Sequence, residues 1–316
     1  MSRRVVPPDA AGLRRAVALL HHDSVVAFPT ETVYGLGAHA FSPAAVAEVY
    51  RLKNRPSWNP LIVHVPTVAA ARSLAAEWPD TAEELAGRFW PGPLTLVVRR
   101  AAHLPDVGRT TAGTIAIRIP AHEVALRLLE ASGLPLAAPS ANRSESVSPT
   151  TAAHVIASLP DVPLVLDGGP CAWGIESTVL DVTSSRPRLL RPGALSLRAL
   201  REAIGPITLP DVEVGDGAVR ASPGMSRRHY APRARLVLAA DVDGRTLAGP
   251  VGTLGYEGPE GPYREVLSAD PREYAADLYA ALHRLDDAGV ATIVAQEPPD
   301  TEDWLAIRDR LRRAAE

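Results

Sequence analysis

The chain has 316 residues, of which 46% are hydrophobic and 22% charged, and its net charge is −3 at pH 7. This length and composition predict an ordinary globular protein of about two domains, without the basic stripe of a nucleic-acid-binding protein. No stretch approaches the roughly 18 apolar residues of a membrane helix, and the start "MSRRVVPPDA" lacks the apolar core of a signal peptide, so we expect a cytoplasmic protein. The single cysteine, Cys171, excludes an internal disulfide and a zinc site built on paired cysteines.

Helical and strand-like patterns alternate along the first part of the chain. Apolar residues recur at helical spacing in residues 9–20 and 43–53, and short apolar runs at 24–28 and 61–65 are typical of strands. Further on, the patterns predict helices at 81–90, 122–132 and 150–159, and strands at 94–99, 114–119, 135–138, 163–169, 177–182 and 188–193. The later strands are too close together for crossover helices, so we expect a mixed sheet in an α/β fold.

A segment rich in proline and glycine separates this part from a smaller α/β unit. The unit's pattern runs strand, strand, long amphipathic helix, strand, helix. The sequence therefore predicts a first domain at 1–208, a linker or lid at 209–234, and a C-terminal α/β domain at 235–316. The first domain has a net charge of +3 and the remaining residues have −6, so the first domain is the better host for an anion.

Lys53 is the only lysine of a chain whose other basic residues are all arginine. Arginine would serve as well on a solvated surface, whereas a site that needs a compact ammonium is poorly served by a planar guanidinium. Lys53 is therefore a candidate for chemistry, and the alternative is the drift of one codon.

Several polar clusters lie at the ends of predicted strands or helices. In "PTETVYG", Thr30, Glu31, Thr32 and Tyr34 stand where α/β proteins place their ligand crevice, although the threonines could simply cap a turn. Lys53, Arg55, Asn59 and His64 fall within twelve residues and suit a polyphosphate clamp, but cations at a helix end also complement its dipole.

The stretch "APSANRSESVSPT" after another strand contains Ser140, Asn142 and Ser148 and could form an anion-binding concavity or a helix cap. Arg118 and Thr114 share one face of a strand, where a buried arginine must find a carboxylate or a phosphate. At the end of the linker, Arg227, Arg228, His229 and Tyr230 could form a lid over a nucleotide or a solvated tether.

The motifs "PTETVYGLG", "LKNRP..NPLIVH", "PGPLTLV", "T.AIRIP", "APSAN.S", "ESTV.D" and "SPGM...HYAP" occur in this order. Together they closely resemble the YrdC-like threonylcarbamoyl-AMP synthase family in its long, two-domain form, over roughly residues 9 to 235. The resemblance implies a twisted mixed α/β sheet with a large concave cavity and a smaller C-terminal α/β, Rossmann-like domain.

By the same resemblance, the chain is expected to be a nucleotidyltransferase that joins L-threonine, bicarbonate or carbon dioxide, and ATP into threonylcarbamoyl-AMP and pyrophosphate. Mg²⁺ is expected to enter with the ATP phosphates. The product would pass to a tRNA threonylcarbamoyl transferase complex, and neither stable nucleic acid binding nor membrane association is expected.

The family motifs also imply a set of site residues. Those expected at L-threonine are Thr32, His64, Arg118, Ala138 and Ser177. Those expected at ATP are Lys53, Arg55, Asn59, Thr114, Ser140, Asn142, Ser148, Arg191 and Tyr230. Lys53, Arg55, Ser140 and Asn142 would act in catalysis.

Two alternatives stay open at this point. One is the related carbamoyl transfer of hydrogenase maturation, which a single cysteine argues against because those proteins carry cysteine-paired zinc modules. The other is a module that binds double-stranded RNA or tRNA, which the modest charge of the first domain argues against.

Overall fold

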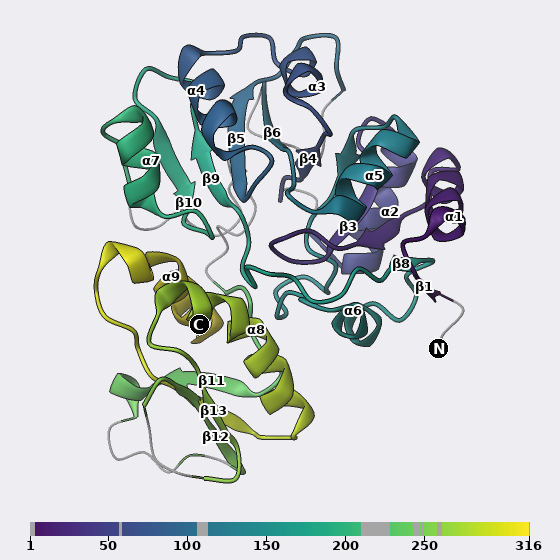
Figure 1. Cartoon of the computed structure of the whole chain (residues 1–316). Helices are drawn as coiled ribbons and strands as arrows, with labels where there is room; N and C mark the ends of the chain where they lie inside the picture. Colours follow the sequence, from purple (N-terminus) through teal and green to yellow (C-terminus); the bar gives the residue numbers. More distant parts are fainter. Residues whose placement is uncertain are drawn as a thin grey trace.

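The computed structural model describes residues 4–56, 59–105, 113–209, 228–242, 247, 249–257 and 261–315, and within these ranges the chain forms two β-sheets. The larger sheet belongs to the part of the chain that precedes the predicted linker, and the smaller sheet to the part that follows it (Figure 1). Arg227 and most of the predicted linker lie outside the described residues.

The larger part interleaves strands and helices as the sequence patterns predict. Its strands are β1 (Val5–Val6), β2 (Val26–Phe28), β3 (Gly35–His39), β4 (Ile62–His64), β5 (Leu94–Arg99), β6 (Thr114–Arg118), β7 (Leu136–Ala137), β8 (Val165–Leu166), β9 (Thr178–Asp181) and β10 (Arg188–Arg191). Its helices are α1 (Ala10–His21), α2 (Pro43–Lys53), α3 (Val68–Ser73), α4 (Asp80–Phe89), α5 (Glu123–Ser132), α6 (Ala152–Ser158) and α7 (Leu197–Ile204).

The larger sheet is mixed, which confirms the expectation from the short spacing of its strands. Its order is β1-β8-β2-β3-β7-β4-β6-β5-β9-β10. β4 and β6 run parallel, whereas β2–β3, β5–β6 and β9–β10 are antiparallel. In the parallel pair, His64 stands beside Arg118 at the carboxyl ends of both strands. This register brings two predicted site residues to one edge of the sheet.

Local signals explain where α2 begins and ends. The Ser42 side chain accepts a hydrogen bond from the backbone N–H of Ala45, and Pro43 takes the first helical position. The helix ends at Lys53, and Asn54 follows in the left-handed conformation with φ of 50°. The turn carries the chain from Lys53 directly to Arg55, so that both cations lie at the same end of the helix.

The smaller part is a parallel sheet with helices against it. Its strands are β11 (Arg235–Leu238), β12 (Val251–Gly255), β13 (Arg264–Val266) and β14 (Thr292–Ala295), in the order β11-β14-β12-β13, and its long helices are α8 (Pro271–Asp287) and α9 (Leu305–Ala315). Figure 1 shows α8 and α9 between this sheet and the larger part. The arrangement confirms the expected second α/β unit.

The two parts share a hydrophobic core. Val33, Val147 and Ile175 of the larger part belong to the same buried cluster as Tyr279 and Leu282 of α8. Apolar burial of this kind is the main stabilising contribution to a packed interface. The helices of the smaller part therefore lie directly behind loops that carry the predicted site. Among the described helices, none is both long and apolar enough to cross a membrane.

Candidate active site

A small cavity collects residues from most of the predicted motifs. The volume of this cavity is about 50 Å³. The predicted site residues that line it are Thr32, Arg55, His64, Arg118, Ala138, Ser140, Ser177, Arg191 and Tyr230. They come from the loop after β2, the turn after α2, the end of β4, the end of β6, the loop after β7, the residue before β9, the end of β10 and the linker end.

The loop after β2 is held by its own threonine hydroxyls. Thr30 Oγ1 donates to the carbonyl oxygen of Val33 at 2.7 Å and accepts from the backbone N–H groups of Thr32 and Val33, both at 3.2 Å. Thr30 Oγ1 also lies 2.8 Å from Thr32 Oγ1. Thr30 thus closes the turn, and Thr32 is fixed at the cavity wall.

Arg118 has an internal partner at the bottom of this cavity. Its Nη2 lies 2.7 Å from Glu31 Oε1, and both side chains are 5% exposed. Its Nε donates to the carbonyl oxygen of Gly92 at 3.2 Å. Neither contact uses Nη1. The neighbouring His64 is buried, and burial together with the Arg118 charge lowers its pKa to about 3, so its ring is neutral near pH 7.

Lys53 is buried and its ammonium group holds the loop that contains Ser140 and Asn142. Nζ donates to the carbonyl oxygen of Ser140 at 2.6 Å and to that of Asn142 at 2.5 Å. Burial lowers the pKa of Lys53 well below its ordinary value, and the charge of Arg55 lowers it further. Lys53 is not among the residues that line the cavity, but its partner Ser140 is.

Arg55 lies at the cavity wall and is also held by backbone oxygens. Nη2 donates to the carbonyl oxygen of Pro60 at 2.8 Å, and Nε donates to that of Asn59 at 3.3 Å. Burial is the main reason that the pKa of Arg55 is lowered to about 10, and the charge of Arg191 acts in the same direction. Asn59 lies behind Arg55, and its buried Oδ1 has no partner in the described part of the chain.

Among the predicted site residues of the loop after β7, some line the cavity and others hold the loop from behind. Asn142 Nδ2 donates to the carbonyl oxygens of Arg143 at 2.9 Å and Ser146 at 2.7 Å, which shapes the turn. Ser148 is fully buried, and its hydroxyl donates to Glu176 Oε1 at 2.6 Å. Asn142 and Ser148 therefore stand behind the wall in this structure, whereas Ser140 stands in it.

Ser177 and Arg191 form the opposite wall. Arg191 Nη2 donates to the carbonyl oxygen of Ser177 at 2.9 Å and to its Oγ at 3.2 Å. Ser177 Oγ also lies 2.7 Å from Thr95 Oγ1. These bonds join the start of β9 to the end of β10.

The end of the linker contributes two lining residues to the cavity, His229 and Tyr230. Tyr230 is completely buried with φ of 61°, and its hydroxyl has no partner among the described residues. The backbone N–H of Ala231 donates to the carbonyl oxygen of Glu145 at 2.8 Å, and that of His229 donates to the carbonyl oxygen of Arg313 at 3.0 Å. Residues 229–231 are therefore packed between the two parts rather than solvated, and the side chains of His229 and Tyr230 occupy space beside Arg55 and Ser140.

Thr114 is the one predicted residue that the structure sets apart. It begins β6, opposite Arg99 of β5, while Arg118 ends the same strand at the cavity. Thr114 is partly exposed and is not among the lining residues.

Glu176 lines the cavity although sequence patterns do not select it as a site residue. His229, expected only as part of a possible lid or tether, lines the cavity as well. Glu176 stands directly before Ser177 in the "ESTV" motif, and His229 directly before Tyr230. No local sequence pattern indicates whether these two side chains are buried at a functional site or exposed on the surface.

The charges around the cavity are unbalanced. Glu31 is paired with Arg118, and Glu176 is paired with Arg310 of α9. In the described part of the chain, neither Lys53 nor Arg55 has a carboxylate partner within ion-pair distance, and both are held by backbone oxygens. Two buried cations without an ion pair are costly in a low-dielectric site unless an anion joins them.

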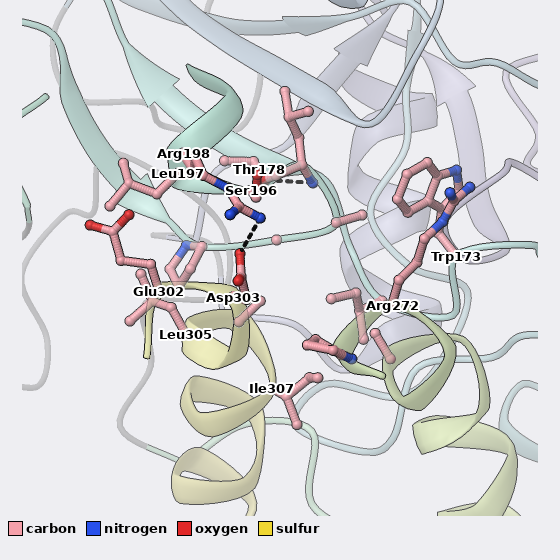
Figure 2. Close-up of a pocket in the computed structure, with 18 of the residues that line it drawn as sticks. Trp173, Thr178, Ser196, Leu197, Arg198, Arg272, Glu302, Asp303, Leu305 and Ile307 are labelled. Atoms are coloured by element: carbon pink, nitrogen blue, oxygen red, sulfur yellow. Dashed lines mark hydrogen bonds and ion pairs between the residues drawn. The ribbon is translucent and has the colours of Figure 1, made fainter. Parts of the chain in front are cut away.

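A second and larger cavity, of about 370 Å³, lies on the other side of the segment that contains Glu176 and Ser177. Figure 2 shows its lining, which is largely apolar and includes Leu197, Leu305 and Ile307. Its charged residues have partners: Arg198 Nη2 lies 3.0 Å from Asp303 Oδ1, and the Arg272 guanidinium lies 4.4 Å from the ring centre of Trp173. No predicted site residue lines this cavity.

The chain is similar to known proteins along its full length. The family profile Sua5/YciO/YrdC, described as "Telomere recombination", matches residues 18–193, and the profile of the threonylcarbamoyl-AMP synthase C-terminal domain matches residues 195–316. Threonylcarbamoyl-AMP synthase of Pyrococcus abyssi is 40% identical, covering 96% of this chain and 94% of the relative. The synthase of Bacillus subtilis is 42% identical, covering 96% and 92%. The solved structure of P. abyssi Sua5 complexed with L-threonine is 38% identical and superposes with a TM-score of 0.88, covering 96% of this chain and 94% of the other.

Proposed function

Because this chain belongs to the Sua5/YciO/YrdC family in its long, two-domain form, we propose that it is a threonylcarbamoyl-AMP synthase. It joins L-threonine, bicarbonate or carbon dioxide, and ATP into threonylcarbamoyl-AMP and pyrophosphate. The relatives with this name extend over nearly the whole chain, which supports this function over hydrogenase maturation and over a simple RNA-binding module.

The observation that carries the proposal is the pair of buried cations without carboxylate partners among the described residues. Lys53 and Arg55 lie at the end of α2, beside the loop of Ser140, and both have lowered pKa values because they are buried. A nucleoside polyphosphate would supply the missing negative charge, with lysine as a point charge and arginine as a planar donor. Ser140, Arg191 and Tyr230 line the same cavity and complete the proposed nucleotide side.

The threonine side is proposed to consist of five other residues that line the same cavity, namely Thr32, His64, Arg118, Ala138 and Ser177. The Nη1 group of Arg118, which Glu31 and Gly92 leave unused, is suited to the substrate carboxylate. The neutral His64 adds a hydrogen-bonding group without adding charge. The similar P. abyssi Sua5 was solved as a complex with L-threonine, which supports an amino-acid site in this fold.

The proposed reaction needs positioning more than proton transfer. N-carboxylated threonine is already anionic, so its attack on the α-phosphorus requires no general base. Two anions must be held together, and the charge that gathers on the leaving pyrophosphate must be neutralised. Lys53 and Arg55 perform the neutralisation, and Lys53 also holds the Ser140 loop through its bonds to two carbonyl oxygens. Tyr230 over the cavity excludes water, which protects the mixed anhydride.

Asn59, Thr114, Asn142 and Ser148 remain proposed ATP residues, although they stand outside the present wall of the cavity. The cavity volume of about 50 Å³ is too small for a nucleotide, so ATP entry requires residues of its lining to move, and we propose His229 and Tyr230 for this role. Asn142 and Ser148 would become accessible if the loop shifts with them. For Thr114 to contact ATP, a larger rearrangement is needed, or the nucleotide must extend along β6.

A divalent metal ion, with Mg²⁺ as our proposal, would enter with the nucleotide. In the described part of the chain, no cluster of three or more histidine, cysteine or acidic side chains could hold a metal, and the two carboxylates beside the cavity are engaged by arginines. Phosphate oxygens and water would therefore supply most of its ligands. When bound, it would add charge neutralisation on the phosphates. We further propose that the enzyme acts in the cytoplasm, where its product passes to a tRNA threonylcarbamoyl transferase.

The proposal is tested by incubating the purified chain with ¹³C-labelled bicarbonate, L-threonine and ATP. Mass spectrometry should detect an adenylated threonine carbamate that carries the label, together with threonine-dependent release of pyrophosphate. Omitting threonine or bicarbonate is the matched control and should abolish both signals. ATP turnover that ignores threonine would contradict the proposal.

A further inference from the structure

We propose that Arg310 and Tyr279 of the C-terminal α/β unit are positioning residues of the active site, which keep the Glu176 carboxylate away from the nucleotide phosphates. The inference rests on the proposed function and assigns a role to the C-terminal unit within it. Removing either side chain should weaken ATP binding while leaving threonine binding nearly unchanged.

The contacts that carry the inference cross from one part of the molecule to the other. Arg310 Nε of α9 donates to Glu176 Oε2 at 3.0 Å, and the Tyr279 hydroxyl of α8 lies 3.0 Å from Oε2 and 3.3 Å from Oε1. Ser148 Oγ donates to Oε1 at 2.6 Å. Both carboxylate oxygens are therefore engaged, and two of these three partners come from the C-terminal unit.

These groups are buried far more deeply than a surface ion pair. The Arg310 side chain is 1% exposed and that of Glu176 is 8% exposed. A buried carboxylate that loses its partner is strongly unfavourable and seeks another cation. Besides Arg310, the cations that interact electrostatically with Glu176 include Lys53 and Arg191. Burial alone would raise the pKa of Glu176, but the charges of Arg310 and Arg191 keep it below the ordinary value.

Glu176 is a lining residue, so its orientation decides the charge that the nucleotide meets. When Arg310 and Tyr279 hold Glu176, neither Lys53 nor Arg55 has a carboxylate partner in the described part of the chain. Both cations are then available to a polyphosphate. Once released, Glu176 can turn toward Lys53, whose pKa its charge raises, or toward Arg191, whose charge lowers the pKa of Glu176. It would then repel phosphate and neutralise the cations that bind it.

The same two residues also support Tyr230. The Arg310 guanidinium carbon lies 4.8 Å from the ring centre of Tyr230, and the Tyr279 and Tyr230 rings stack with centres 5.8 Å apart. A loss of nucleotide binding could therefore arise through Tyr230 alone. The test must separate this route from the carboxylate route, and a second substitution at Glu176 does so.

The experiment compares four full-length variants with the wild type: Arg310→Met, the double variant Arg310→Met with Glu176→Gln, Tyr279→Phe, and the control Arg312→Met. Arg312 lies on the same helix, but it is exposed and paired with Glu297. Calorimetry measures the Kd of a non-hydrolysable ATP analogue and, separately, of L-threonine. Methionine keeps most of the arginine volume, which limits repacking.

We expect Arg310→Met to raise the Kd of the ATP analogue by about tenfold or more, which corresponds to about 1.4 kcal/mol, with the Kd of threonine changed less than about twofold. The double variant should recover most of this loss, because the carboxylate that competes with phosphate is gone. Tyr279→Phe should show a smaller loss in the same direction, and Arg312→Met none.

Three outcomes would overturn the inference. In the first, Arg310→Met binds the ATP analogue as tightly as the wild type does. In the second, the double variant recovers none of the lost ATP affinity, which assigns the effect to Tyr230. In the third, threonine affinity falls as much as ATP affinity. If the wild type itself binds no ATP analogue, the proposed function fails instead. The inference is then judged by urea unfolding, where Glu176→Gln should restore stability that Arg310→Met removes. If the Arg310 variants do not fold, Tyr279→Phe alone decides between the outcomes.

Discussion

The two cavities on either side of the Glu176–Ser177 segment differ in size and in the state of their charges. The larger one is mainly apolar, and its Arg198–Asp303 pair is solvated at the rim, with 64% and 42% of the side chains exposed. The smaller one is lined by Arg55, and Lys53 holds the Ser140 loop of its wall from behind. Both cations are buried and have no carboxylate partner within the described residues. The proposed active site is therefore distinguished from the larger cavity by its incomplete charge balance and not by its volume.

The largest expected effect follows from breaking the buried Arg118–Glu31 pair. Arg118→Met leaves Glu31 buried without its cation, which should reduce the free energy of unfolding by about 3–5 kcal/mol and weaken threonine binding. Urea unfolding and calorimetry measure the two effects. Arg127→Met is the control, because its pair with Glu123 is exposed. A stability loss no greater than that of the control would mean that burial does not distinguish the two kinds of pair.

The next effect concerns Lys53. Lys53→Ala should reduce threonine- and bicarbonate-dependent pyrophosphate release by at least about a hundredfold, since both a charge and the support of the Ser140 loop are lost. Lys53→Arg should also lose most of the activity, because a planar guanidinium cannot replace a compact ammonium between two carbonyl oxygens. Arg51→Ala on the same helix, where the side chain is 66% exposed, should be unaffected. Wild-type activity in the arginine variant would refute the requirement for a compact cation.

A smaller effect is expected from the neutral histidines. The pKa of folded His64 is lowered to about 3, so the unfolded chain binds its proton near pH 6.5 and the folded chain does not. The stability that neutral His64 contributes is fully present above pH 6.5 and is lost as the pH falls toward 3. Over this range it lowers the free energy of unfolding by up to about 1.4 kcal/mol per pH unit. His64→Gln should make the unfolding free energy fall less steeply as the pH is lowered from about 6.5 to about 5, as urea unfolding at each pH measures.

His154 offers a comparison outside the cavity, because burial and the neighbouring His283 lower its pKa to about 4. His154→Gln should flatten the same pH profile without changing substrate binding. Unchanged slopes in both variants would show that neither ring stays neutral in the folded chain.

The smallest effect is expected at the larger cavity. Arg198→Ala removes the exposed pair with Asp303 and should change the unfolding free energy by less than about 1 kcal/mol, with pyrophosphate release unchanged. Thermal unfolding and the standard activity assay measure both. A marked loss of activity would show that the interface behind the Glu176–Ser177 segment acts on the reaction, and the comparison of the two cavities would have to be redrawn.

Much of the fold and of the site can be predicted from local patterns. The pattern at 43–53 predicts a helix with the bounds that α2 has, since Ser42, Pro43 and the end at Lys53 are local signals. Elements with weaker patterns, such as α3 and β13, do not follow from periodicity. They are short, and tertiary packing rather than local preference decides them.

The sequence by itself determined which chemical groups were available and which helices and strands they lie on or near, because local periodicity specifies those elements. Only the tertiary structure decided which of these groups meet. It directed the ammonium of Lys53 onto the carbonyl oxygens of Ser140 and Asn142, placed Thr114 at the far end of β6, and joined Arg310 to Glu176 across 134 positions of the chain. Such contacts depend on how the two parts pack through their shared core, and no short-range pattern encodes that packing.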